Sequence, residues 1–231
     1  MHSTRHIKGL GILASSIIFI SLMSCNTSEP RGFTSAELSL INSADSIMRV
    51  YTTESEEDMT VLRNLSSDLP AEALLSDEFM RLTDMMLTTV THPSQDGVGI
   101  AAPQVGLNRR IVAVQRFDKQ PDSQGNHPFE IYANIRIVSS SDSLEAGPEG
   151  CLSVPGRSGD VMRSESVVIE YADLAALKAQ DHADMTDNPD SAGKGEVPMI
   201  RETVSGFTAV IFQHETDHLE GILYIDRLIQ Q

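Results

Sequence analysis

The chain has 231 residues, of which 40% are apolar, and this is enough for one substantial folded domain with a terminal extension. Its formal net charge is −16, and lysines and arginines form no cluster along the chain. Because nucleic-acid binding depends on clustered cations that neutralise phosphates, we expect no nucleic-acid partner. A solvated acidic surface accounts for the charge.

The first 24 residues have the pattern of an export signal. Arg5 and Lys8 precede an uncharged stretch, residues 10–23, which is shorter than the roughly 20 apolar residues of a membrane-spanning helix. The stretch leads into Ser24 and Cys25 and resembles a bacterial lipoprotein signal, in which the cysteine after the cleavage site is lipidated. An uncleaved anchor helix is the alternative.

We therefore expect a signal peptide over residues 1–24, a polar tether over residues 25–45 and a catalytic domain over residues 46–231. The exported protein would be held on a membrane through Cys25 and would face the periplasm or the cell surface; without a working signal it would be cytoplasmic. Cys25 and Cys151 are the two cysteines of the chain, so lipidation of the first leaves the second without a disulfide partner.

Residues 76–171 contain signals for a helix and three strands. Apolar residues at positions 79, 82, 86 and 90 recur at helical spacing after Ser76, a residue typical of a helix start. Runs rich in β-branched residues predict strands, with a turn over residues 118–128 between the first two. These runs are residues 109–115, 129–138 and 166–171.

The last part of the chain contains a polar segment and then a helix. Residues 172–203 are polar and predict a long surface excursion, and residues 206–220 predict a helix that ends at Gly221. On this helix an apolar stripe of Phe207, Val210 and Ile211 continues into His214 and His218, so the two imidazoles face the interior.

Two histidines four residues apart can bind one metal ion, and Glu215, directly after the first, can serve as a general base. A satisfied pair of core histidines is the alternative, but the His-Glu-x-x-His pattern favours a metal. The third ligand must come from earlier in the chain, because only ten residues follow Gly221. Carboxylates and four other side chains are candidates: His92, His127, His182 and Cys151.

His127 and His182 lie in predicted surface loops, which are poor supports for a rigid metal site. Cys151 lies in an apolar stretch between turn residues. A small buried apolar role and a ligand role are equally open for it on chemistry alone.

Three segments together resemble the three signature motifs of the peptide deformylases, in that family's order. They are GVGIAAPQVG at residues 97–106, EGCLSVPG at residues 149–156 and QHETDHLEGILYIDR at residues 213–227. The resemblance covers most of residues 45–229. It implies an α+β fold in which mixed and antiparallel sheets pack around a C-terminal helix that carries the histidine pair. It also implies hydrolysis of the formyl group from N-formylmethionyl peptides.

The resemblance assigns roles to individual residues. Cys151, His214 and His218 would hold one divalent metal, most often Fe(II) in this family, with Zn(II) or Ni(II) as alternatives. Glu215 would be the general base, and the Gln104 side chain would donate to the oxyanion.

Further roles concern the oxyanion, the substrate and the support of the site. The backbone N–H of Leu152 would be a second oxyanion donor. Val98, Gly99, Val210 and Ile211 would border the substrate, and Glu149 and Arg163 would form a supporting ion pair. The chain departs from the family at Asn134-Ile135, where Asn-Pro is common, and in the length of residues 118–130 and 172–203.

Two other functions fit the same pattern. One is a cell-envelope metallo-amidase or peptidase that acts on a non-formyl amide. The other is a lipoprotein that binds metal or peptide without turnover, against which Glu215 and Gln104 argue, because storage needs neither a base nor an oxyanion donor.

Overall fold

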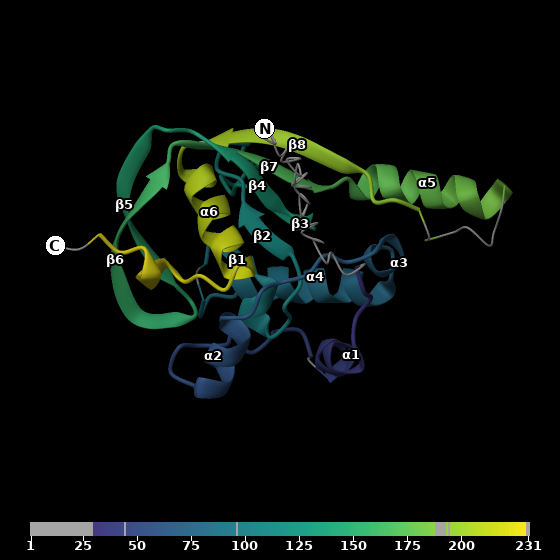
Figure 1. Cartoon of the computed structure of the whole chain (residues 1–231), viewed down its shortest axis with the longest axis horizontal. Helices are drawn as coiled ribbons and strands as arrows, with labels where there is room; N and C mark the ends of the chain where they lie inside the picture. Colours follow the sequence, from purple (N-terminus) through teal and green to yellow (C-terminus); the bar gives the residue numbers. More distant parts are fainter. Residues whose placement is uncertain (1–29, 44, 96, 188–192, 194, 230–231) are drawn as a thin grey trace, which may run out of the picture.

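The computed structural model describes residues 30–43, 45–95, 97–187, 193 and 195–229 (Figure 1). The predicted signal peptide and Cys25 lie outside these residues. Within the described part of the chain, no helix is both long and apolar enough to cross a membrane.

Among the described residues, four helices precede the first strand. The longest, α4, starts behind Ser76, whose hydroxyl accepts a hydrogen bond from the Phe79 N–H at 3.2 Å, which confirms the predicted cap. Its apolar side, including Phe79, Leu82 and Met86, is buried in the main core. The helices are α1 (Ser35–Ser43), α2 (Glu56–Leu62), α3 (Ala71–Leu74) and α4 (Asp77–Val90).

In the part of the chain that the structure describes, eight strands form three antiparallel sheets. The first sheet has the order β1 (Gly99–Ala101), β2 (Ile111–Gln115), β3 (Phe129–Ala133). The second has the order β4 (Arg136–Ser140), β7 (Ser166–Ala172), β8 (Met199–Ser205), and the third is a ribbon of β5 (Leu144–Cys151) and β6 (Val154–Ser164). Short 3-10 helices η1 (Ala102–Val105) and η3 (Tyr224–Asp226) complete the described elements together with α5 (Leu174–Asp187) and α6 (Phe207–Leu219).

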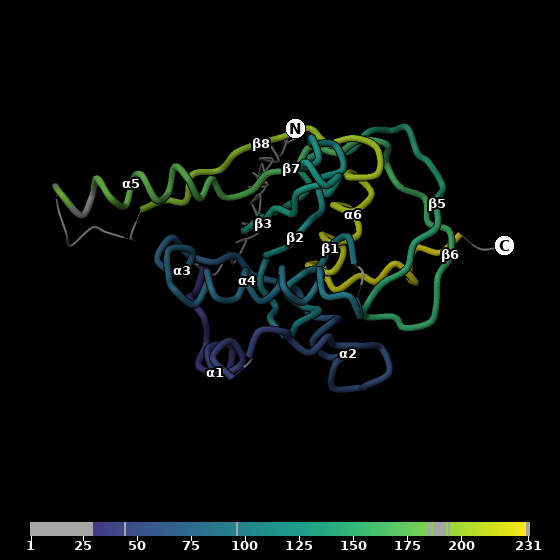
Figure 2. Tube along the Cα trace, turned by 180° about the vertical axis from the view of Figure 1, so that it is seen from behind, coloured from purple at the N-terminus to yellow at the C-terminus, as the bar shows by residue number. Residues whose placement is uncertain are grey.

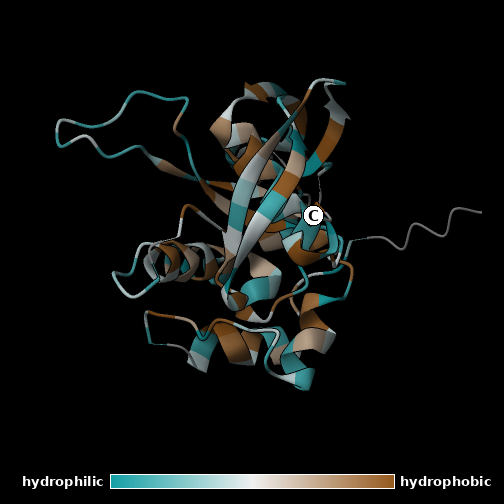
Figure 3. Ribbon diagram, turned by 90° about the vertical axis from the view of Figure 1, so that its left-hand side faces the viewer, coloured by the Kyte–Doolittle hydropathy of each residue, from teal (hydrophilic) through white to brown (hydrophobic). Residues whose placement is uncertain are grey.

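Helix α6 lies between the β5–β6 ribbon and the first sheet (Figure 1). Ile211, Phe212 and Leu219 of this helix are buried in a cluster with residues of β2, β3 and β7, so the helix is held by sheets on its apolar side. Figure 3 views the molecule from the ribbon side and shows polar and apolar residues mixed along β5 and β6. The architecture is mixed α and β with antiparallel sheets around the C-terminal helix, as expected.

The predicted strand over residues 129–138 is two strands in different sheets. The strand is interrupted at Asn134, whose φ of 52° is in the left-handed region that asparagine tolerates better than most residues. The Asn134 side chain holds the break in place, because its amide oxygen accepts from the Leu69 N–H and its amide nitrogen donates to the Leu69 carbonyl, both at 2.8 Å.

The prediction of a surface excursion over residues 172–203 was wrong in part. This segment contains helix α5 and, after it, strand β8, which pairs with β7 along its length. Helix α5 extends away from the body of the molecule (Figure 2), and Leu177 anchors its first turns in the main core. The helix has no continuous apolar face, which is why its period is hard to recognise in the sequence.

The predicted tether over residues 25–45 is also folded in its described part. Helix α1 packs beside α4, with Ile41 fully buried. The buried guanidinium of Arg109 donates to both Glu37 carboxylate oxygens at 2.7 Å and to the carbonyls of Arg31 and Gly32, also at 2.7 Å. Residues 31–43 therefore form a docked strap, and they are part of the domain.

Candidate active site

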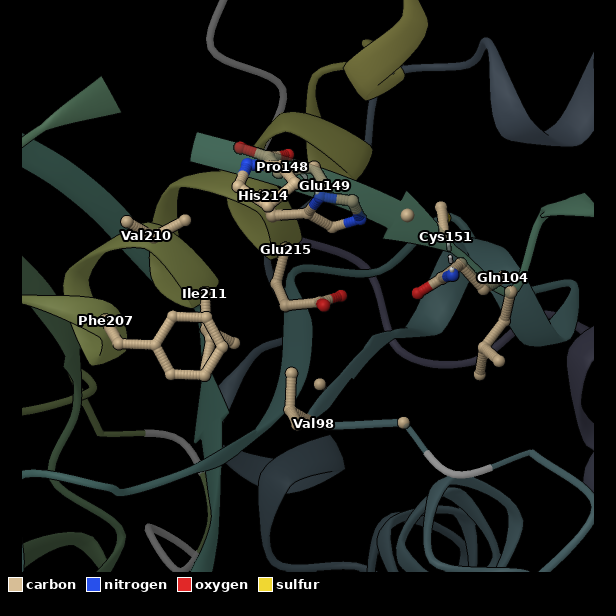
Figure 4. Close-up of a pocket in the computed structure, with 14 residues that line it drawn as sticks. Val98, Gln104, Pro148, Glu149, Cys151, Phe207, Val210, Ile211, His214 and Glu215 are labelled. Atoms are coloured by element: carbon tan, nitrogen blue, oxygen red, sulfur yellow. Dashed lines mark hydrogen bonds and ion pairs between the residues drawn. The ribbon is translucent and has the colours of Figure 1, made fainter. Parts of the chain in front are cut away.

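Three potential metal ligands from two elements converge at one end of a cleft. His214 and His218 are on α6, and Cys151 is the last residue of β5. The ligand atoms of the three residues lie within 4.8 Å of one another, and Cys151 Sγ is 3.3 Å from His218 Nε2. Figure 4 shows Cys151 and His214 pointing toward the same space from opposite sides.

Local structure explains why Cys151 reaches the histidines. The register of the β5–β6 ribbon shifts between Gly150 and Cys151, so that Cys151 pairs with Val154 across a tight turn. Such a bulge redirects a side chain at the end of a strand. On α6 the buried apolar side fixes the rotation of the helix and places His218, which is 1% exposed, beneath the turn.

A buried ion pair orients His214. Glu149 Oε2 is 2.8 Å from His214 Nδ1, and Arg163 donates to both Glu149 oxygens at 2.7 and 2.9 Å. Burial alone would raise the pKa of Glu149, but Arg163 and His214 lower it to about 2, so the carboxylate is ionised and accepts the proton of Nδ1. This bond leaves Nε2 of His214 free to face Cys151.

The pKa values of the two histidines are shifted in opposite directions. Burial opposes a charge on His214, yet its contacts with Cys151 and Glu149 raise its pKa to about 10. Burial and the charge of His214 lower the pKa of His218, which keeps its imidazole neutral, the form that ligates metals. One thiolate and two imidazoles suit Fe(II), Zn(II) or Ni(II) better than Mg²⁺ or Ca²⁺, so the donor set fits the expected ion.

Glu215 is buried beside the Cys151, His214 and His218 group. It is 4% exposed, and its Oε2 has no hydrogen-bond partner among the described residues. Burial raises the pKa of Glu215 to about 7, which is the range in which a carboxylate exchanges protons readily near neutral pH.

Gly99 provides the space for the Glu215 carboxyl group. A Cβ on Gly99 would lie 2.8 Å from Glu215 Cδ and 2.9 Å from Cγ, with Oε1 closer still. The sequence predicted that Gly99 borders the substrate, and the residue does line the cleft. The atoms nearest to a Cβ at this position, however, belong to the side chain of Glu215.

Gln104 is fixed by three hydrogen bonds. Its Oε1 accepts from the Ala101 N–H at 2.8 Å, and its Nε2 donates to Ser153 Oγ at 3.2 Å and contacts Cys151 Sγ at 3.4 Å. The amide nitrogen is thereby held next to the ligand group, with the Leu152 backbone following Cys151 on the same rim.

The cleft has a volume of about 410 Å³ and collects most of the predicted site residues. Arg163 stands behind Glu149, and His218 lies beneath the floor. The sequence did not predict that Gly97, Pro148, Gly150 and Phe207 line the cleft. It also did not predict Ser153, which accepts a hydrogen bond from Gln104. A third missed residue is Asp217, whose carboxylate accepts hydrogen bonds from Arg163 and Arg227 at 2.6 Å each. The cleft is lined by Gly97, Val98, Gly99, Gln104, Pro148, Glu149, Gly150, Cys151, Leu152, Phe207, Val210, Ile211, His214 and Glu215.

The remaining histidine candidates lie elsewhere. His92 is half-buried and bonds Ser94, and His182 is exposed on α5. His127 stacks against Phe117 with ring centroids 5.0 Å apart. Among the described residues, the one group of three or more possible ligands is that of Cys151, His214 and His218.

The model of the polypeptide deformylase family matches residues 48–185 and 195–231 of this chain. The chain belongs to the peptide deformylase family. The matched residues include the potential metal ligands Cys151, His214 and His218 and the neighbouring Glu215, whereas residues 1–47 and 186–194 fall outside the match.

Individual deformylases support this membership. Peptide deformylase 2 of Gloeobacter violaceus is 36% identical over 157 residues, 68% of this chain and 70% of that protein. The peptide deformylase of Caulobacter vibrioides is 32% identical over 182 residues, 79% of this chain and 88% of that protein. Among solved structures, a class I type b deformylase from Acinetobacter baumannii with bound Met-Ala-Ser is 29% identical with a TM-score of 0.60, covering 79% of this chain and 98% of that one. The deformylase from Thermotoga maritima is 25% identical with a TM-score of 0.61, over 80% and 100% of the chains.

Proposed function

We propose that this protein hydrolyses the formyl group from N-formylmethionyl peptides. The observation that carries the proposal is the convergence of Cys151, His214 and His218 beside the buried carboxyl group of Glu215, in a cleft of a deformylase fold. The Acinetobacter relative binds Met-Ala-Ser, the peptide that deformylation of formyl-Met-Ala-Ser leaves.

Cys151, His214 and His218 would hold a single divalent metal, for which we propose Fe(II). When bound, such an ion lowers the pKa of a ligated water and polarises a carbonyl oxygen. Zn(II) and Ni(II) suit the same donors. Elemental analysis of protein purified without air tests the choice: about one iron per chain is expected, and stoichiometric zinc or nickel with no iron would contradict it.

Glu215 moves the proton in the proposed reaction. Its carboxylate takes a proton from the attacking water, whose oxygen bonds to the formyl carbon, and the same proton passes to the amine nitrogen as the C–N bond breaks. Formate and a free α-amine are the products. A pKa near neutrality lets Glu215 act as base first and acid afterwards.

Gln104 and the backbone N–H of Leu152 would donate to the oxygen of the formyl group as negative charge develops there. Each such donor typically contributes about 3 kcal/mol to lowering the barrier. The bonds of Gln104 to Ala101 and Ser153 hold its amide in place before substrate arrives, so little reorganisation is needed.

The apolar end of the cleft would receive the methionine side chain. Val98, Val210 and Ile211 line this end together with Phe207, and Gly99 keeps the strand edge open. The formyl carbon carries only a hydrogen, so a narrow site at the ligand group accepts it and excludes larger acyl groups.

A comparison of formyl-Met-Ala-Ser with acetyl-Met-Ala-Ser tests the assignment against a general amidase. Formate release from the first with no measurable acetate release from the second is expected. Equal rates would support the envelope amidase, and binding of both without turnover by metal-loaded protein would support a binding lipoprotein.

We further propose that the protein is exported and anchored on a membrane through lipid on Cys25. The support is the pattern of residues 1–25, together with the docked strap that begins at Arg31. Four residues separate Cys25 from Pro30, and even a fully extended chain of this length spans only about 18 Å. An anchored domain would work close to the membrane surface, on finished peptides rather than on nascent chains.

Fractionation of cells that produce the full chain tests this proposal. The protein is expected in the membrane fraction, and a Cys25→Ala variant in the soluble fraction. Recovery of the unaltered protein from the cytosol would overturn export.

A further inference from the structure

The two proposed oxyanion donors lie on different elements of the chain. Gln104 is in η1, and the Leu152 N–H is in the turn between β5 and β6. Both donors have to reach the place where negative charge develops, so the position of η1 relative to this turn has to be fixed. One bond fixes it directly, because Gln104 Nε2 donates to Ser153 Oγ at 3.2 Å.

A third segment, residues 51–53, connects the same two elements through its backbone. The Tyr51 N–H donates to the Gln104 carbonyl at 2.8 Å. The Thr53 N–H donates to the Ser153 carbonyl, also at 2.8 Å. Gln104 and Ser153 are 1% and 0% exposed, so both bonds end at buried groups, where a hydrogen bond is stronger than in water. We call residues 51–53 the bridge segment.

The Tyr51 side chain adds a second contact between the bridge segment and η1. A Cβ on Gly106, the residue that ends η1, would lie 2.8 Å from three atoms of this side chain. The Arg49 guanidinium lies 4.0 Å from the centroid of the same ring, within the range of a cation–π contact. The ring therefore contacts both η1 and the chain that leads into the bridge segment.

The carboxylate of Asp58 holds the bridge segment. It accepts from the Thr52 N–H at 3.0 Å and from the two terminal nitrogens of Arg49 at 2.7 and 2.8 Å. The side chain of Asp58 is only 3% exposed, and hydrogen bonds to an ionised group are stronger than those between neutral groups. One buried carboxylate thus fixes the chain before and after Tyr51.

We propose that Asp58 is a positioning residue for deformylation: it fixes the bridge segment, and the bridge segment fixes the Gln104 amide relative to the Leu152 N–H. The inference rests on the proposed deformylase function and extends the residues that the function needs beyond the lining of the cleft. A displacement of about 1 Å at the reacting groups can lower a rate about a hundredfold, so a remote anchor can matter.

Steady-state kinetics of Asp58→Ala on formyl-Met-Ala-Ser, with measured metal content, tests the proposal. We expect kcat to fall at least about tenfold, because misplaced donors lose part of the factor of about 10²–10³ that one oxyanion donor contributes. KM is expected to stay unchanged, because these donors act in the transition state. Metal content is also expected to stay unchanged. An unaltered kcat in folded, metal-loaded Asp58→Ala would overturn the proposal.

Asp226→Ala is the matched control. The Asp226 carboxylate also accepts from both terminal nitrogens of an arginine, Arg63, and from a backbone N–H, that of Leu223 at 2.9 Å. In the described part of the chain, neither of these partners bonds Gln104 or Ser153. This variant is expected to keep the wild-type kcat. An equal fall in kcat for both variants would indicate a general loss of rigidity and would count against the positioning role.

A double-mutant cycle with Gln104→Ala separates positioning from a general effect on the fold. If Asp58 acts through the relative position of the two donors, its loss has little further effect once one donor is absent. We expect Asp58→Ala to lower kcat at least about tenfold in the wild-type background and less than about threefold in the Gln104→Ala background. Equal factors in the two backgrounds would contradict the assignment.

Replacing Thr53 by its α-hydroxy acid tests the bridge without altering a buried side chain, and it decides the question if Asp58→Ala does not fold. The resulting ester lacks only the N–H that donates to the Ser153 carbonyl. We expect kcat to fall at least about threefold. The same replacement at Glu54, whose N–H has no hydrogen-bond acceptor among the described residues, is expected to have no effect. Equal kcat in the two esters would refute the bridge.

The wild-type protein keeps the two proposals distinct. If metal-loaded wild type does not hydrolyse formyl-Met-Ala-Ser, the deformylase function fails. If wild type is active and both Asp58→Ala and the ester at Thr53 are equally active, only the positioning role of Asp58 fails.

Discussion

At the scale of single residues, the ligands could be predicted from the sequence, whereas their support could not. The i and i+4 spacing of His214 and His218 identifies a metal pair from local pattern alone, and Cys151 required the resemblance of its motif to a family. The contact between Gly99 and Glu215 joins β1 to α6. A steric fit between two segments that are distant in the sequence cannot be predicted from the residue pattern of either segment alone.

That fit leads to a prediction for Gly99→Ala. The added methyl group would displace the Glu215 carboxyl group, with KM little changed. We expect kcat to fall at least about tenfold, and by no more than the factor of about 10²–10⁴ that a general base contributes. Gly32→Ala is the matched control, because a Cβ there meets nothing within 4 Å. Steady-state kinetics with measured metal content checks this, and unchanged kcat in Gly99→Ala would refute the positioning role.

At the scale of elements, those with clear apolar periodicity were predicted with little error. Helices α4 and α6 fall where spacing and caps indicate them. The break at Asn134 and the helix α5 were missed, because the first depends on side-chain bonds to Leu69 and the second has no apolar face. Tertiary contacts decide the break at Asn134.

Arg163 joins β5, β6 and α6 through Glu149 and Asp217. Replacing it by methionine would leave Glu149 without its main partner, and loss of one member of a buried ion pair typically costs about 3–5 kcal/mol. We therefore expect Arg163→Met to lower the melting temperature clearly and, through His214, to weaken metal binding about 10- to 100-fold.

The control for Arg163 is Arg201→Met. Arg201 on β8 pairs with Glu170 on β7 but is 67% exposed, and exposed pairs contribute at most about 1 kcal/mol. Thermal unfolding and metal titration of both variants check the comparison. Similar behaviour of the two would show that the buried pair does not support the site.

At the scale of the whole molecule, the strap extends the domain beyond the part that matches the family. Residues 31–43 precede that match, yet they satisfy the buried Arg109 and bury Ile41. No sequence pattern predicts this docking, because the segment is short and polar and its partner, Arg109, lies far along the chain. Deleting residues up to 45 is expected to destabilise the domain, because it would leave a buried cation without its carboxylate.

The strap also predicts a pH dependence of stability. Burial alone would raise the pKa of Glu37, but Arg109 and Thr34 lower it below the ordinary 4.5. Its stabilising effect is therefore complete above pH 4.5 and is lost as the pH falls through the lowered value. Wild type is expected to melt above Glu37→Gln at pH 7, and the difference between the two melting temperatures is expected to narrow as the pH falls below 4.5.

Glu57→Gln, which alters an exposed acid on α2, is the control for Glu37 and is expected to change the melting temperature little at either pH. Melting curves at pH 7 and pH 3 for the three proteins provide the measurement. A gap for Glu37→Gln that widens on acidification would show that the sign of the argument is wrong.

The measurement that tests the central claim most directly is formate release from formyl-Met-Ala-Ser by the form beginning at residue 30, loaded with Fe(II) without air. Wild type and a Glu220→Ala control, which alters an exposed carboxylate at the end of the same helix, are expected to turn over. Glu215→Ala is expected to lose about 10²–10⁴ in kcat while it still binds one metal. No formate from folded, metal-loaded wild type, or undiminished turnover by Glu215→Ala, would contradict the account.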